Sequence, residues 1–80
     1  MKYRINIVHT NNSDGIYIDN QLTYQDYQIN PMEFLLHLKI HIPGSAKLND
    51  LIVDEWWADE EWAKKLTRLP KYFNDVKKRF

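Results

Sequence analysis

A glutamate and two histidines recur at intervals of four residues, a spacing that could build a metal site. On a helix, Glu33, His37 and His41 would stack along one side, and zinc accepts both carboxylate and imidazole ligands. No fourth ligand is evident, and such short spacings often match by chance. On a strand, His37 and His41 would stand about 13 Å apart, too far to share one ion. We therefore interpret the three residues as a polar stripe and expect neither a metal nor a cofactor.

The chain lacks the sequences on which common enzyme mechanisms depend. It has no cysteine, which excludes thiol catalysis, disulfides and thiolate zinc sites. Its only glycines are Gly15 and Gly44, so it has no glycine-rich phosphate loop. Its two serines, Ser13 and Ser45, lie in turn sequences and not in a nucleophile elbow. A chain of 80 residues also has little room for a buried cleft. We therefore expect a protein that is not an enzyme.

The least ordinary feature is an acidic tryptophan patch, in which residues 54–62 hold three tryptophans and five acids. Trp56 and Trp57 are adjacent, so on a helix or a strand they cannot both face one core. An exposed indole among carboxylates is typical of a binding hot spot for a basic partner surface. The alternative is that a small domain covers both indoles. The candidate partner-binding residues are Asp54, Glu55, Trp56, Trp57, Asp59, Glu60 and Glu61.

The zero net charge conceals two blocks of opposite sign. Residues 50–61 carry six acids and no base, whereas residues 62–80 carry seven bases and one acid. On a continuous helix most of these bases would share one outer face, which could contact phosphates. That face makes a nucleic-acid-binding module the alternative function, although a solvated face is the commoner fate of helical lysines. The candidate nucleic-acid-binding residues are Lys64, Lys65, Arg68, Lys71, Lys78 and Arg79.

The leading functional prediction is a small interaction protein, an inhibitor or adaptor of phage or mobile-element type. Isoleucine, asparagine and lysine supply 23 residues, and their codons are AT-rich, a composition common among such accessory genes. We expect the acidic tryptophan patch to bind a host protein that has a basic surface. Its carboxylates could also imitate the phosphates of a nucleic acid.

The first thirty residues favour β-structure. Tyr3, Ile5 and Ile7 alternate with polar residues, as in a half-buried strand. Residues 11–15 predict a turn, because Asn, Asp and Gly tolerate positive φ, and residues 15–18 restart a strand. Residues 22–29 could form a third strand. The segment therefore predicts an antiparallel meander of two or three strands.

The central segment has two interpretations. Asn30, Pro31 and Glu33 form a helix-start signal, because Asn caps, Pro suits the first helical position and Glu completes a capping box. Residues 36–42, however, alternate strictly between apolar and polar, as a strand would. The capping signal favours a helix over residues 31–42, largely buried because it is apolar on nearly every side. A strand remains the alternative.

The last third predicts a long helix near residues 59–80, kinked at Pro70. Its apolar residues are spaced 4, 3, 4, 3 and 4 apart, as in a heptad seam; they are Trp62, Leu66, Leu69, Phe73, Val76 and Phe80. If the sheet were too small to cover the seam, the stretch from Trp62 to Phe73 would form a homodimer contact. Between the helices, residues 51–53 are compatible with a short strand.

These segments together predict one α+β domain over residues 1–80, with a β-meander packed against a central helix and a kinked C-terminal helix. Nothing near Met1 resembles a signal peptide, and the longest apolar stretch is interrupted by His37, Lys39 and His41. We therefore expect a cytoplasmic protein that does not contact a membrane.

Overall fold

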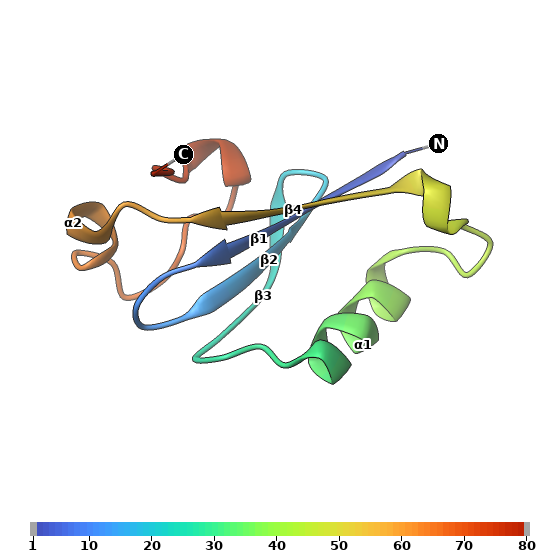
Figure 1. The fold of residues 1–80 in the computed structure, drawn as a ribbon, viewed down its shortest axis with the longest axis horizontal. Coiled ribbons are helices and arrows are strands. Elements are labelled where there is room, and N and C mark those ends of the chain that lie inside the picture. The colour runs from blue at the N-terminus through green and yellow to red at the C-terminus, as the bar shows by residue number, and fades with distance from the viewer. Residues whose placement is uncertain (1, 80) are drawn as a thin grey trace.

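The structure is a computed structural model and describes residues 2–79. The elements are β1 (Tyr3–His9), β2 (Asp14–Ile18), β3 (Gln21–Asp26), α1 (Pro31–His41), β4 (Leu51–Trp57) and α2 (Glu60–Ala63), with short 3₁₀ turns at Leu48–Asp50 and Phe73–Asp75 (Figure 1). The sheet order is β3-β2-β1-β4. The predicted α+β class is confirmed. The sheet is mixed, however, because β1, β2 and β3 are antiparallel neighbours whereas β4 runs parallel to β1.

Two tight connections join the first three strands, one held by side-chain hydrogen bonds and the other formed by left-handed backbone. Between β1 and β2, the Thr10 hydroxyl accepts the N–H groups of Asn12 and Ser13, at 3.2 and 2.9 Å. Between β2 and β3, Asp19 and Asn20 have φ angles of 49° and 76°. Asp and Asn tolerate this left-handed backbone, which suits a two-residue hairpin.

Helix α1 begins where the sequence predicts. The Asn30 side chain accepts the N–H of Glu33 at 2.8 Å and donates to the Glu33 carboxylate at 2.8 Å. The strand alternative over residues 36–42 is therefore wrong, because the cap and Pro31 begin a helix first. The expectation that this helix is largely buried is also wrong, since none of its residues is buried.

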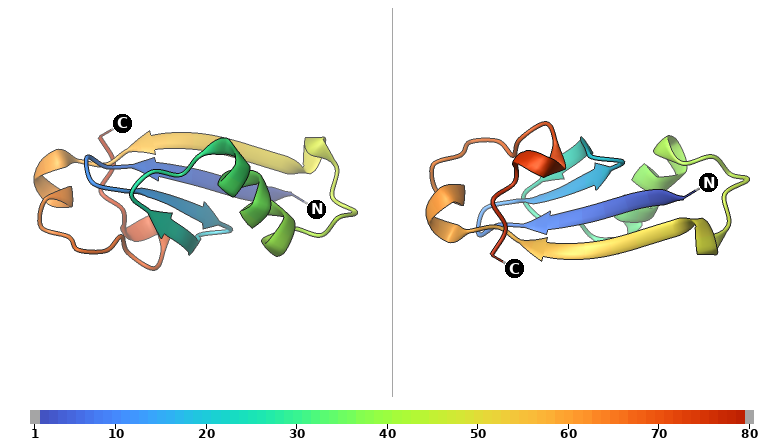
Figure 2. Two further views of the ribbon diagram at one scale, coloured as in Figure 1. Left: turned by 90° about the horizontal axis from the view of Figure 1, so that it is seen from below. Right: turned by 90° about the horizontal axis from the view of Figure 1, so that it is seen from above.

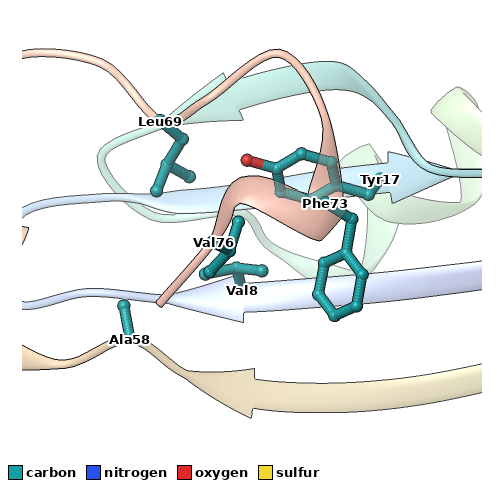
Figure 3. Packing of buried hydrophobic residues seen from close by; sticks show 6 residues of the cluster. All are labelled: Val8, Tyr17, Ala58, Leu69, Phe73 and Val76. Atoms are coloured by element: carbon teal, nitrogen blue, oxygen red, sulfur yellow. The ribbon is translucent and has the colours of Figure 1, made fainter. Parts of the chain in front are cut away.

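The two faces of the sheet are covered at opposite ends. Helix α1 lies on one face, over the end where β1 begins, and the C-terminal segment (residues 64–79) lies on the other face, over the end where β1 finishes (Figures 1 and 2). Alternate residues of each strand consequently enter two separate cores. The α1-side core is built around Ile5, Ile16, Ile18 and Ile42. Figure 3 shows the other core, formed by Val8, Tyr17, Ala58, Leu69, Phe73 and Val76.

The predicted long C-terminal helix does not form. Helix α2 ends after four residues, and the C-terminal segment that follows crosses the sheet without continuous helix or strand. Its backbone finds partners outside the segment: Leu69 N–H donates to the Gln25 side chain at 2.9 Å, and the Tyr17 hydroxyl donates to Pro70 O at 2.7 Å. Pro70 has no N–H to give to a helix, so these distant partners replace the helical ones.

Apolar residues of the predicted seam pack within the protein itself. Leu69, Phe73 and Val76 are buried in the core of Figure 3, and Trp62 packs against it. The predicted homodimer contact along this seam is therefore not available to a second copy. Phe80 lies outside the described residues. Within residues 2–79, no helix is long and apolar enough to cross a membrane.

Candidate partner-binding surface

Strand β4 is an edge strand, and most of its outer side is open (Figure 2). Backbone groups alternate along it: Ala58 N–H points to β1 and bonds His9 O at 2.9 Å, whereas Trp57 O points outward and accepts Arg79 N–H at 3.0 Å. The C-terminal segment adds only an isolated bridge there, between Ala58 and Lys78. At the start of β4 the outward N–H of Leu51 bonds Leu48 O, and among the described residues nothing pairs with the outward backbone of Val53 and Glu55.

The two adjacent tryptophans lie on opposite faces, as strand alternation requires. Trp56 faces the core under the C-terminal segment, and its indole N–H donates to the Asn6 amide oxygen at 2.7 Å. Trp57 lies on the α1 side, where α1 does not reach, and its side chain is 48% exposed. The exposed indole of the acidic tryptophan patch is therefore Trp57.

A histidine that the sequence analysis missed lies beside Trp57. The ring centroids of His9 and Trp57 are 5.2 Å apart. His9 Nδ1 is 2.8 Å from Asp14 Oδ1, and His9 Nε2 is 3.9 Å from Glu55 Oε1. These four side chains and Tyr27 line an open hollow of about 570 Å³. His9 and Asp14 are paired across β1 and β2 on either side of the observed turn at residues 10–13, whereas the sequence placed Asp14 inside a turn and so gave no cross-strand contact between them.

The chemistry of this hollow suits a cation. An exposed indole face attracts Lys and Arg side chains, and the carboxylate of Glu55, itself exposed, lies next to it. Asp54 points to the opposite face of β4, because successive side chains alternate. Neither carboxylate forms an ion pair with a lysine or arginine of residues 2–79.

The other acids of the predicted site have local roles. The Asp59 carboxylate caps α2 by accepting Trp62 N–H at 3.1 Å. Glu60 lies 3.8 Å from Arg79, and Glu61 lies 3.7 Å from Lys64. The structure therefore does not gather all the predicted residues into one surface. It leaves Glu55 and Trp57 together at the β4 edge, with Asp54 on the other side of the strand.

The predicted basic face does not form, because it depended on a continuous helix. Lys64 and Arg79 pair with glutamates of α2. The Lys78 ammonium lies 4.7 Å from the Trp56 ring centroid and 4.1 Å from that of Phe73. Lys71 lies over Tyr72 at 5.5 Å. Of the remaining two candidates, Lys65 is exposed, and Arg68 lines a hollow beside β3.

The polar stripe of α1 contacts β3. The Tyr24 hydroxyl donates to Glu33 Oε2 at 2.8 Å, and the Tyr24 ring stacks on His37 with centroids 3.9 Å apart. The ring centroid of His41 lies 6.3 Å from that of His37. Within the described part of the chain, no group of three or more His, Asp or Glu side chains could hold a metal ion. In this structure Glu33 and His37 of the stripe pack against Tyr24 of β3.

No family model matches this chain, and no curated protein or solved structure matches it. What the protein does must consequently be inferred from its own surfaces.

Proposed function

We propose that this protein is a non-enzymatic interaction protein, an inhibitor or adaptor, that binds a basic extended segment of a partner protein along β4. The observation that carries the proposal is the open outer backbone of β4 beside the half-exposed Trp57. An extended segment would add to this edge as a fifth strand, bound mainly through backbone hydrogen bonds. That the partner is the host protein of a phage or mobile element stays a prediction from composition.

The charges of β4 favour a basic segment. Side chains of an added strand alternate between the two faces of the sheet, and each face of β4 offers one carboxylate, from Asp54 or Glu55. A lysine or arginine on the α1 side would also meet the face of the Trp57 indole. A basic segment is therefore attracted on both faces, whereas an acidic one is repelled on both.

Affinity capture with a strand-blocking variant tests the proposal. The N–H of Val53 points outward, so Val53→Pro removes an outer donor and leaves the hydrogen bonds between β1 and β4 in place. Tagged wild-type protein and this variant are incubated with nuclease-treated lysate of the organism that carries the gene. We expect a discrete protein to bind the wild type and to be reduced about tenfold or more with Val53→Pro and with Trp57→Ala.

The matched control is Tyr72→Ala, which removes an exposed aromatic side chain of the C-terminal segment. This variant should retain the captured protein, and circular dichroism should show all three variants folded. Equal capture by folded Val53→Pro would contradict the proposal, as would capture seen only in a parallel incubation with lysate that has not been treated with nuclease.

A further inference from the structure

Helix α1 has a large apolar side that nothing in residues 2–79 covers. Four of its residues, Met32, Leu35, Leu36 and Ile40, and Leu48 of the following connection are each 55% to 84% exposed. Scattered exposed apolar residues are ordinary, but a contiguous patch of this kind marks an interaction site. The patch is distinct from the β4 edge and hollow on which the proposed function rests.

This apolar side borders a groove of about 490 Å³ between α1 and the connection to β4. Leu38, Ile42 and Leu51, which also belong to the α1-side core, line it. The only charged residues that line the groove are Lys39 and Lys47, both exposed, and no carboxylate lines it among the described residues. The groove therefore combines an apolar lining with a positive rim.

We propose that this groove docks an amphipathic helix of a partner protein, with an apolar stripe on the groove and carboxylates beside the two rim lysines. A helix fits because α1 satisfies its own backbone hydrogen bonds and offers no open strand edge. A segment docked against α1 must likewise satisfy its own backbone, as a helix does. The 11 residues of α1 extend about 16 Å, which matches three turns of a partner helix.

The charges favour such a partner over a second copy of this chain. A symmetric pair would bring the groove of one copy against that of the other, and the Lys39 and Lys47 side chains of both copies would then share one interface to which the groove lining supplies no carboxylate. Like charges facing each other at an interface oppose association, whereas carboxylates on a partner helix attract.

Selection from a displayed library of helical peptides of about 16 residues tests this assignment. We expect wild-type protein to enrich peptides with apolar residues at i, i+3 or i+4 and i+7 and with Asp or Glu beside that stripe. Leu36→Asp should abolish capture of the enriched peptides, and the double variant Lys39→Glu and Lys47→Glu should reverse the charge preference. Tyr27→Asp, at a side chain 77% exposed and outside the groove, is the matched control and should bind as the wild type does.

Each other outcome overturns the proposal. No enrichment, enrichment of basic peptides, or equal capture by folded Leu36→Asp would show that the groove does not select acidic helices. If analytical ultracentrifugation showed that the wild type is a dimer and that Leu36→Asp is a monomer, the groove would be assigned to a second copy. Binding to phosphatidylglycerol vesicles that Leu36→Asp abolishes would assign it to a membrane surface.

Discussion

The indole N–H of Trp56 donates a 2.7 Å hydrogen bond to the amide oxygen of Asn6, a residue 50 positions away in the sequence. Asn6 is only 2% exposed, and it is the only buried polar residue among those described. Its amide oxygen therefore depends on a partner within the protein. This bond holds Trp56 toward the core, and strand alternation then places Trp57 outside.

Replacing Trp56 by Phe should lower the free energy of unfolding by about 1–3 kcal/mol, because it removes the donor of a buried acceptor. Trp57→Phe is the matched change on the other face and should cost less than about 0.5 kcal/mol. Urea unfolding followed by circular dichroism measures both. Similar losses for the two variants would contradict the assignment of Trp56 to the core.

Gly15 is required by close packing and not by its backbone angles. A methyl group at Gly15 would collide with the Leu69 side chain, whereas a methyl group at Gly44 meets nothing within 4 Å. Gly15→Ala should therefore destabilise the protein by about 1–3 kcal/mol, and Gly44→Ala should be nearly neutral. Equilibrium unfolding of the two variants checks this difference. A neutral Gly15→Ala would mean that the C-terminal segment packs elsewhere.

The cap of α1 should contribute measurably to stability. Asn30→Ala removes the acceptor of Glu33 N–H and should cost about 1 kcal/mol. Thermal unfolding provides the measurement, and Gln28→Ala, at an exposed position before the helix, provides the control. If both variants unfolded at the same temperature as the wild type, the cap would contribute no measurable stability.

Hydrogen bonding by the Tyr24 hydroxyl should lower the pKa at which the Asp26 carboxyl titrates. The single hydroxyl proton of Tyr24 is shared between the carboxylates of Asp26, at 2.7 Å, and Glu33, at 2.8 Å. The hydrogen bond to Asp26 lowers the pKa of that carboxyl, and Tyr27 N–H lowers it further. Because the folded pKa lies below the unfolded value of about 3.9, the stability from Asp26 is present above that value and is lost as pH falls through the folded pKa. Tyr24→Phe should raise the pKa of Asp26 in an NMR titration of its carboxyl. No upward shift would contradict the hydrogen bond.

Alkaline titration should single out two tyrosines. Burial, and secondly the charge of Asp75, raises the pKa of Tyr17, and hydrogen bonds to Asp26 and Glu33 raise that of Tyr24. Their folded pKa values exceed the unfolded value of about 10, so their stabilisation is complete below that pH and is lost as pH rises through the folded pKa. Ultraviolet absorbance of phenolate should therefore show a late phase. Tyr17→Phe and Tyr24→Phe should each reduce it, and an unchanged late phase would refute the assignment.

Local sequence determined the features whose energy depends on near neighbours. The turn between β1 and β2, predicted at residues 11–15 and observed at 10–13, depends on residues within a few positions. The same holds for the Asn30 cap of α1, the alternation of β1 and the opposite faces of Trp56 and Trp57. The heptad spacing also identified Leu69, Phe73 and Val76 as core residues, although no helix contains them.

Tertiary structure alone decided the rest, because the deciding partners lie far apart in the chain. Leu69 N–H finds Gln25 across 44 residues, and Tyr17 reaches Pro70 across 53, so an irregular C-terminal segment replaces the predicted helix. The parallel pairing of β4 with β1 likewise creates the open edge beside Trp57. The small sheet leaves the outer side of α1 uncovered, which no pattern within α1 itself could show. The free energy from hydrogen bonds and burial between such distant residues outweighs the local preference of a segment for helix or strand. The residue pattern within that segment does not encode those contacts.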